Sequence, residues 1–184
     1  MNKIKNIGIQ TAKPIRDIAV IDNIKNGLKM RDRVMFVIGI NTALRISDII
    51  TLKKSDIKDC IELREKKTGK IKEFKLSPSV MALVKKYMSF TDSDWLFPSR
   101  KYGGHINRIT AYKIIKGVAN VLGLDHITPH SMRKTFGYQA FKNQGVPLPY
   151  IMAAYNHSSI KTTMRYLGIE QEELNDELYS KMSL

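Results

Sequence analysis

The segment NHSSIKTTMRYLG, residues 156–168, contains a histidine, small hydroxyl side chains and, nine positions after the histidine, a tyrosine. Ser158 or Ser159 can cap a short helix that would carry Tyr166, and Gly168 would end it. A tyrosine beside a basic residue near a C-terminus is usually a half-buried anchor. A chemical role for Tyr166 therefore needs support from the rest of the chain.

The composition favours a single folded domain that binds a polyanion. The chain has 184 residues, of which 43% are hydrophobic, enough for one good-sized core. Thirty-one Lys and Arg against seventeen Asp and Glu give a net charge of +14, which makes nucleic acid the first partner to consider. The longest apolar run, VMFVIGI at 34–40, is far shorter than the roughly 20 residues that a bilayer requires. We therefore expect no membrane partner.

Two further features concern the compartment. Cys60 is the only cysteine, which excludes an internal disulfide and a cysteine zinc cluster. The first residues, MNKIKNIGIQTAKPIRD, lack the apolar stretch of a secretory signal. We expect a cytoplasmic protein.

The hydrophobic pattern predicts a mainly α fold with a small antiparallel β-hairpin or three-stranded sheet. IELREKKTGKIKEFKL, residues 61–76, is the hairpin, with basic and small residues at its turn. The segment DIITLKKSDI predicts a short helix that ends before Asp56. The other helices are predicted at about 19–30, 31–40, 77–88, 107–122, 131–143, 147–155 and 170–184. We expect a basic arm at 1–18, a folded domain at 19–168 and a C-terminal helix at 169–184.

The residue patterns indicate chemistry without a metal or cofactor. No Asp/Glu cluster has Mg²⁺-binding spacing, and there is no glycine-rich phosphate loop, HExxH or Cys/His zinc pattern. A metal-free enzyme acting on a phosphodiester needs fixed cations instead, and two arginines can supply them. Tyrosine is a weak nucleophile at its usual pKa near 10, but it can form a covalent intermediate with a phosphate neutralised by arginines.

Several motifs together resemble one family. Arg45 in TALRISDIITL, HSMR at 130–133, NHSS at 156–159 and Tyr166 resemble the catalytic domain of the tyrosine recombinases, the phage-integrase family. The order Arg, hairpin Lys, His-x-x-Arg, His, Tyr also fits, and the resemblance spans about residues 19–180. It implies a site-specific DNA recombinase that cleaves and rejoins DNA through a covalent 3′-phosphotyrosine, without metal or ATP, to integrate, excise or invert DNA. It also implies a bacterial or phage-encoded protein associated with the nucleoid.

The resemblance also implies roles for individual residues. Arg45 and Arg133 would clamp the scissile phosphate and stabilise the pentacoordinate transition state. Tyr166 would attack phosphorus. His130 would serve proton transfer from the tyrosine, and His157 would hydrogen-bond the phosphate.

Two supporting roles follow from the same resemblance. Asp48 occupies the place of the family acid that supports the active site by hydrogen-bonding a catalytic histidine. Lys67 fits the general acid that protonates the leaving 5′-oxygen, with Lys70 as the alternative. A lysine suits this role if its pKa falls, which neighbouring cations would favour.

The chain departs from the family pattern in three places. Ala43 stands where a glycine is usual, and Tyr155-Asn156 stands where Leu-Gly commonly precedes the histidine. Only about 18 residues precede the expected catalytic domain, where most members carry an N-terminal helical domain. The chain is therefore either a natural short recombinase or a fragment of a longer one.

The remaining cations are expected to bind DNA phosphates without sequence preference. They are Lys53, Lys54, Lys66, Lys70, Lys72, Arg100, Lys101, Arg108, Lys134 and Lys161. Double-stranded DNA is the expected partner, with a free monomer, a tetramer in the synapse and accessory DNA-bending proteins. The C-terminal helix either docks on a neighbouring protomer or packs on its own domain.

Two other functions compete with recombination. A type IB topoisomerase-like enzyme shares the chemistry but relaxes supercoils, and a DNA-binding accessory protein would keep the fold without cutting. The sequence leaves open the recognition site, the choice between integration, excision and inversion, and whether Tyr166 acts in its own active site or a neighbour's.

Overall fold

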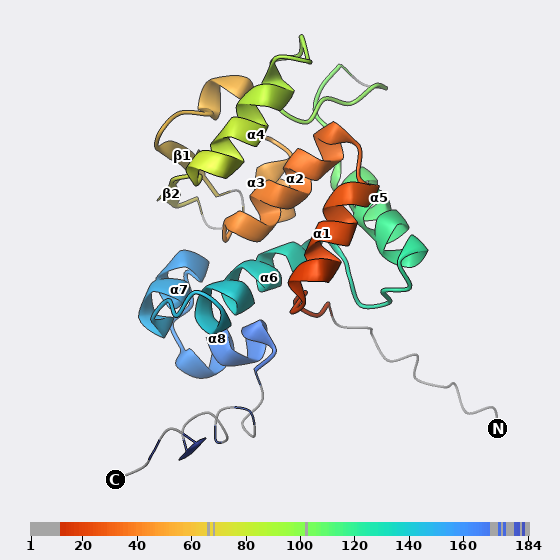
Figure 1. The fold of residues 1–184 in the computed structure, drawn as a ribbon. Coiled ribbons are helices and arrows are strands. Elements are labelled where there is room, and N and C mark those ends of the chain that lie inside the picture. The colour runs from red at the N-terminus through yellow and green to blue at the C-terminus, as the bar shows by residue number, and fades with distance from the viewer. Residues whose placement is uncertain are drawn as a thin grey trace, which may run out of the picture.

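A computed structural model describes residues 12–65, 67, 69–101, 103–169, 173, 175, 179, 180 and 182 (Figure 1). The described part is mainly helical, with one short 3-10 helix and two antiparallel strands, which confirms the predicted fold class. The first elements are α1 (Ile18–Gly27), α2 (Met30–Asn41), α3 (Ile46–Ile49), the 3-10 helix η1 (Lys54–Asp56), β1 (Ile61–Arg64) and β2 (Ile71–Phe74). The later helices are α4 (Pro78–Met88), α5 (Arg108–Val121), α6 (Pro129–Lys142), α7 (Leu148–Tyr155) and α8 (Ile160–Leu167).

Helix α2 forms the centre of the main core. Its residues from Val34 to Ile38 are all buried, as their continuous apolar run predicts. Gly39 lets α6 approach closely, because a Cβ at this position would lie 2.8 Å from the sulfur of Met132. The close crossing brings the first turns of α6 beside the segment that follows α2, which contains Arg45.

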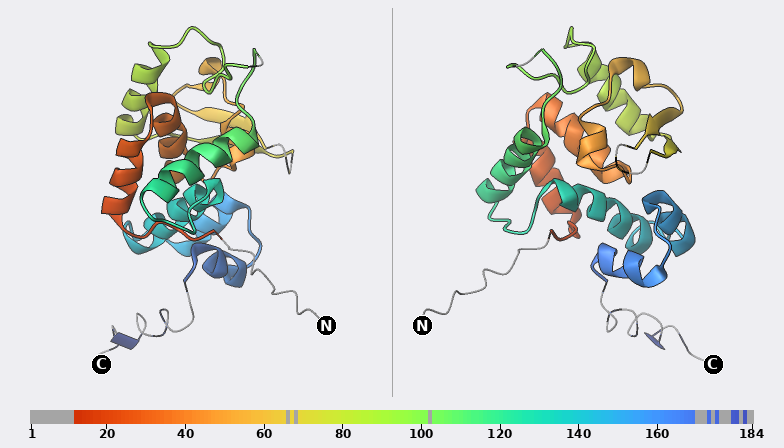
Figure 2. Two further views of the ribbon diagram at one scale, coloured as in Figure 1. Left: turned by 90° about the vertical axis from the view of Figure 1, so that its right-hand side faces the viewer. Right: turned by 180° about the vertical axis from the view of Figure 1, so that it is seen from behind.

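The hairpin lies on the same side of the molecule as α7, away from α5, in Figure 1 and in the right view of Figure 2, and Lys72 of β2 contacts Ala154 of α7. Strands β1 and β2 pair with Ile61 opposite Phe74 and Leu63 opposite Lys72. Ile61 is fully buried, whereas Ile71 is 59% exposed at the start of β2. This arrangement brings Lys72 of β2, and Lys70 just before the strand, close to the C-terminal end of α7.

The predicted helix DIITLKKSDI was wrong over most of its length. Helix α3 ends at Ile49, and only the single turn η1 follows. The carbonyl of Leu52 accepts a hydrogen bond of 2.9 Å from the backbone N–H of Leu96. Pairing with a distant segment therefore takes the backbone group that a continuous helix would use internally, a tertiary effect that overrides local propensity.

Part of the segment assigned to a basic arm packs against α6. Ile15 is 2% exposed, its N–H donates to Thr135 Oγ1 at 2.8 Å, and its carbonyl accepts from Gln139 Nε2 at 3.0 Å. Residues 1–11 and most of the expected C-terminal helix at 169–184 lie outside the described residues. No helix in the described part is both long and apolar enough to cross a bilayer.

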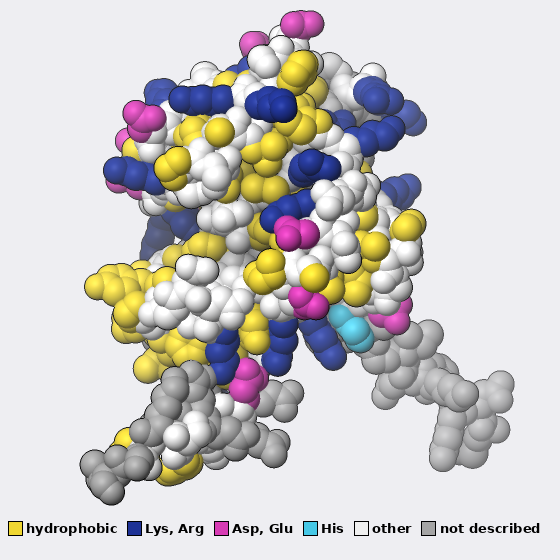
Figure 3. Space-filling model, in the orientation of Figure 1, with side chains coloured by type: hydrophobic (Ala, Val, Ile, Leu, Met, Phe, Trp, Pro, Cys, Tyr) yellow, Lys and Arg dark blue, Asp and Glu magenta, His cyan; other side chains and the backbone are white. Residues whose placement is uncertain are grey.

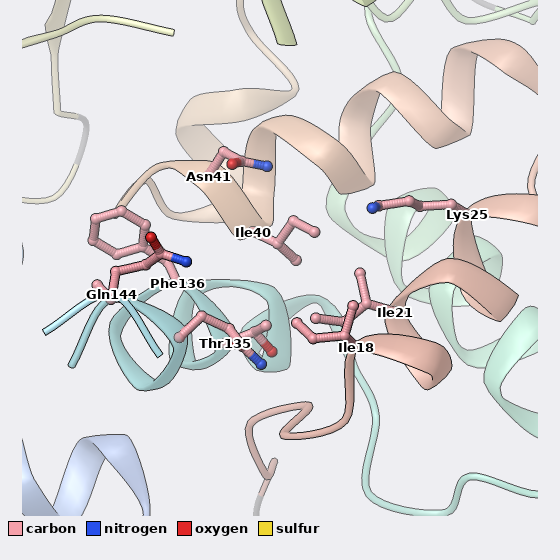
Figure 4. A pocket seen from close by; sticks show the side chains of 10 residues that line it. Ile18, Ile21, Lys25, Ile40, Asn41, Thr135, Phe136 and Gln144 are labelled. Atoms are coloured by element: carbon pink, nitrogen blue, oxygen red, sulfur yellow. The ribbon is translucent and has the colours of Figure 1, made fainter. Parts of the chain in front are cut away.

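An open pocket of about 310 Å³ lies between α1, α2 and α6 (Figure 4). Its lining is mixed, with the apolar Ile18 and Phe136 beside the polar Asn41 and Gln144 and the charged Lys25. None of the candidate catalytic side chains lines it. The candidate catalytic side chains therefore lie outside this pocket.

Candidate active site

Arg133 is a buried cation held on both sides by main-chain oxygens. It lies in the second turn of α6, a helix that begins after the cap residue Thr128, and it is 4% exposed. Its Nη1 donates to the carbonyl of Ala43 and its Nη2 to the carbonyl of Tyr155, at 3.1 Å for the second bond. A buried charge is costly unless it is hydrogen-bonded, so these bonds fix the guanidinium in one orientation.

Arg45 follows Ala43 by two residues and is paired with a buried acid. Its Nη1 lies 3.0 Å from Oε2 of Glu65, whose side chain is 4% exposed. Arg45 also lines a cleft of about 570 Å³ together with Lys67 and His105. The sequence prediction missed Glu65, although an acid within the basic turn sequence REKKTGK was a signal for it.

Tyr166 lies on α8, beside the candidate histidines of the same chain. The helix that carries it is capped by Ser159 and ended by Gly168, both as predicted. Its ring centroid is 5.2 Å from that of His130 and 5.3 Å from that of His157. The hydroxyl is buried and forms no hydrogen bond of regular geometry with the described residues, although the Arg133 guanidinium lies close enough to interact with it. A buried hydroxyl without a regular hydrogen bond marks a group to be examined for function.

Burial and the neighbouring charges have opposite effects on the pKa of Tyr166, and burial has the larger effect. Burial raises the pKa of Tyr166, whereas the guanidiniums of Arg133 and Arg45 lower it. The ammonium of Lys134 lies 5.3 Å from the centre of the tyrosine ring. The tyrosine therefore needs a base to become a nucleophile, and two arginines are present to stabilise the charge.

Both candidate histidines are poised to be neutral near pH 7. Burial lowers the pKa of His130 below its ordinary 6.5, and the charges of Lys134, Arg133 and Arg45 lower it further. Burial, Arg133 and Arg45 likewise lower the pKa of His157. A neutral imidazole can accept a proton, so either ring has the protonation state of a general base.

His157 is oriented by the segment between it and Tyr166. Its Nδ1 lies 3.1 Å from Oγ1 of Thr163, a fully buried residue of α8. Its backbone N–H donates to the carbonyl of Met152 at 2.9 Å. Asn156 before it adopts a left-handed conformation with φ 57°, which asparagine tolerates better than most residues.

Two hairpin lysines reach across to the turn that precedes His157. Nζ of Lys72 donates to the carbonyl of Ala154 at 2.6 Å, and Nζ of Lys70 donates to Oδ1 of Asn156 at 3.1 Å. The sequence placed both lysines on a DNA-binding surface. The structure instead places Lys72 at the junction of β2 and α7, partly buried.

The charge of Lys72 is part of the candidate site. Burial lowers the pKa of Lys72 to about 8, with Arg133 and Arg45 acting in the same direction and Glu65 and Asp48 opposing them. Because this value lies below the unfolded 10.5, the unfolded chain binds more protons between about pH 8 and 10.5. The contribution of Lys72 to stability therefore rises with pH across this window.

This linkage predicts a pH-dependent effect of Lys72→Met. The free energy of unfolding of the wild type, measured relative to that of Lys72→Met, should increase from about pH 8 to about pH 10. Denaturant unfolding at several pH values measures the difference. Lys75→Met, at an exposed lysine, is the matched control and should show no such trend. A flat difference for Lys72→Met would mean that Lys72 titrates as a solvated lysine.

The other predicted residues include both buried and exposed side chains. Asp48 is buried on α3, at 1% exposure, and Lys67 is exposed at the hairpin turn. Lys54 donates to the carbonyl of Thr91, and Lys134 lies beside Tyr166, so neither belongs simply to an outer cationic surface. Lys66 lies outside the described residues. The exposed members of the set are Lys53, Lys70, Arg100, Lys101, Arg108 and Lys161.

The molecular surface carries cationic and hydrophobic side chains in different regions. Lys and Arg side chains are spread over α4 and the loops near it, whereas hydrophobic side chains gather over α7 (Figure 3). Tyr150 of α7 is 69% exposed. Within the described part of the chain, no group of three or more His, Cys, Asp and Glu residues is placed to hold a metal ion.

Comparisons with known proteins agree with this arrangement. The profile of the phage integrase family matches residues 11–173. The probable integrase/recombinase YoeC of Bacillus subtilis is 36% identical over 166 residues, which cover 87% of this chain and 91% of that protein. The chain spans about half the length of other curated relatives, tyrosine recombinases named XerA, XerC and XerD.

Solved structures share the fold. The crystal structure of XerA recombinase superposes with a TM-score of 0.77 at 20% identity, over 95% of this chain and 67% of that one. The XerH site-specific recombinase bound to its difH substrate gives 0.69 at 18% identity, over 100% of this chain and 58% of that one. The helical arrangement that carries Arg45, Arg133 and Tyr166 is therefore a recombinase catalytic-domain fold.

Proposed function

The chain belongs to the phage integrase family, and we propose that it is a site-specific recombinase that cleaves and rejoins DNA through a covalent 3′-phosphotyrosine at Tyr166. The observation that carries the proposal is the buried hydroxyl of Tyr166 beside the guanidinium of Arg133. It lies between His130 and His157, whose pKa values are lowered, and close enough to Arg133 for that charge to act on it. A core tyrosine would not need these neighbours.

In this proposal the two arginines bind the non-bridging oxygens of the scissile phosphate. Charge grows on these oxygens as the phosphorus becomes pentacoordinate. Arg133 is already fixed by two carbonyls and Arg45 by Glu65, so the cations are oriented before the substrate arrives. Such preorganised charge in a site shielded from water is commonly the largest contribution to catalysis.

The proton transfers follow from the protonation states. His130 accepts the proton of Tyr166 as the tyrosine oxygen forms a bond to phosphorus, and the bond from phosphorus to the 5′-oxygen breaks. Lys67, which shares the cleft with Arg45, gives a proton to the leaving oxygen. Lys70 remains the alternative donor. Attack by another 5′-hydroxyl reverses the steps and rejoins the strand, so no ATP is consumed.

The remaining groups support this arrangement. His157, held by Thr163, hydrogen-bonds the phosphate. Asp48 is buried nearby, and its charge opposes the lowering of the pKa of Lys72. We propose double-stranded DNA as the partner, bound by the exposed cations, with two protomers at each site and four in the synapse. XerH, which has the same fold, was crystallised with its difH DNA.

The role of His130 predicts the acid limb of the pH profile. Since its pKa is lowered from 6.5, the imidazole should stay neutral at pH 6.5 and gain a proton only below it. The cleavage rate should therefore be half-maximal below pH 6.5. Single-turnover rates between about pH 5 and 8 measure it, and His130→Gln should remove the limb while His157→Gln keeps it. A midpoint above 6.5, or a limb that persists in His130→Gln, would exclude His130 as the base.

The proposal is tested with a DNA site selected by this protein from a randomised duplex library; a full site binds two protomers, and each half-site binds one. Two copies of the full site are placed on one plasmid, and the protein is added with EDTA. The proposal predicts recombinant products that require both copies. Relaxation of a plasmid without any site would favour a type IB topoisomerase-like enzyme, and tight binding without cleavage would favour an accessory DNA-binding protein.

A further inference from the structure

Tyr155 ends α7 and contacts three of the candidate catalytic residues. It is 1% exposed and is among the largest fully buried side chains. Its ring centroid lies 5.0 Å from that of Tyr166 and 5.2 Å from that of His157, and 4.8 Å from Cζ of Arg133. A single aromatic ring therefore packs against the proposed nucleophile, a phosphate-binding histidine and a phosphate-binding arginine.

Tyr155 and Arg133 are joined in both directions. The Tyr155 hydroxyl donates to the carbonyl of Arg133 at 2.6 Å, and Nη2 of Arg133 donates to the carbonyl of Tyr155 at 3.1 Å. The guanidinium also lies over the tyrosine ring, a favourable cation–π geometry. These contacts tie α6 to α7 through the side chain whose orientation the proposed chemistry requires.

A glycine on α6 leaves room for the Tyr155 hydroxyl. Gly137 lies one turn after Arg133 on α6, and a Cβ there would overlap the Tyr155 hydroxyl and the side chain of Leu167. Burial raises the pKa of Tyr155 well above its ordinary 10, so the hydroxyl remains a donor at every working pH. An aliphatic residue such as leucine would fill much of the space but would neither donate to α6 nor offer an aromatic face to the arginine.

We propose that Tyr155 is a positioning residue for DNA cleavage, which sets the guanidinium of Arg133 and the ring of Tyr166 relative to each other. The inference rests on the proposed function, because it assigns Tyr155 a role in that reaction. Tyr155 does not touch the reacting atoms in this role. It acts through Arg133 and Tyr166, and Gly137 provides the room that its hydroxyl needs.

Two substitutions separate the hydroxyl from the ring. Tyr155→Phe keeps the ring and should lower the single-turnover cleavage rate at saturating DNA about tenfold, since one hydrogen bond to α6 is lost. Tyr155→Leu also removes the aromatic face and should lower it about 100-fold. The Kd for DNA should change less than about threefold in both, because the exposed cations are untouched. Tyr150→Leu, at an exposed tyrosine on the same helix, should leave the rate unchanged.

A double-mutant cycle distinguishes positioning from simple packing. If Tyr155 acts through Arg133, adding Tyr155→Leu to Arg133→Lys should lower the cleavage rate less than about threefold. The same substitution in the wild type should lower the rate about 100-fold. Equal costs in both backgrounds, or unchanged rates in both Tyr155 variants, would overturn the inference. If a thermal unfolding assay shows that Tyr155→Leu does not fold, Tyr155→Phe is used for both the rate measurement and the double-mutant cycle. Absence of a covalent adduct in the wild type would instead overturn the proposed function itself.

Discussion

Tyr166→Phe should form no covalent adduct with DNA. The substitution removes a single oxygen, and that hydroxyl forms no hydrogen bond of regular geometry with the described residues. Its loss should therefore cost little stability, and the ring contacts with His130, His157 and Tyr155 can remain. Every step of the proposed chemistry needs the oxygen, so cleavage should fall below detection while the fold and DNA binding persist.

The measurement uses a nicked suicide substrate built from the selected half-site, which traps the cleaved state. A denaturing gel should show a protein–DNA adduct with the wild type, also in EDTA, and none with Tyr166→Phe. Tyr150→Phe, at an exposed tyrosine of α7, is the matched control and should cleave like the wild type. An adduct that persists in Tyr166→Phe would show that another residue is the nucleophile.

Arg133→Ala should lower the cleavage rate by about 10²–10³-fold or more, the usual effect of removing a preorganised group that stabilises a transition-state charge. DNA affinity should change little, because Arg133 is 4% exposed and contributes little to an outer phosphate-binding surface. The rate at saturating DNA and the Kd, measured separately, give the two effects. Arg45→Ala should behave in the same way.

Two controls are needed to compare the effects of Arg133→Ala on cleavage and on DNA binding. Arg133→Ala also removes bonds to the carbonyls of Ala43 and Tyr155, so its thermal unfolding must be measured beside the wild type. Arg165→Ala removes an exposed arginine next to Tyr166 and should leave the ratio of cleavage to binding unchanged. Equal losses of cleavage and binding in Arg133→Ala would reduce Arg133 to an ordinary phosphate contact.

The elements that local signals specify were predictable from the sequence. Ser77 and Ser159 cap the N-termini of α4 and α8, Pro78 is the first residue of α4, and Gly168 ends α8 with φ 71°. These residues act on their immediate neighbours, so a short window contains the information. The helix expected from DIITLKKSDI failed for the opposite reason, because its backbone bonds to Leu96, more than forty residues away.

Motif spacing selected Arg45, Arg133 and Tyr166 as candidates but gave no information on their surroundings. The structure brings these three residues close enough together for both guanidiniums to act on the pKa of Tyr166. Lys72 looked like one more surface cation, since nothing in its strand shows that it reaches the carbonyl of Ala154. Tyr155 was noted only as a departure from a pattern, because its bonds to Arg133 depend on how α7 packs against α6.

The most direct test of the central claim is to locate the DNA on the protein. The wild-type adduct on the suicide substrate is digested with nuclease and trypsin, and the modified peptide is fragmented in a mass spectrometer. The tryptic peptide that starts at Tyr166 also contains Tyr179, so fragment ions must separate the two. Attachment of the nucleotide 3′-phosphate to the oxygen of Tyr166 is the predicted result. Attachment to Tyr179 or to any other residue would contradict the assignment of the nucleophile.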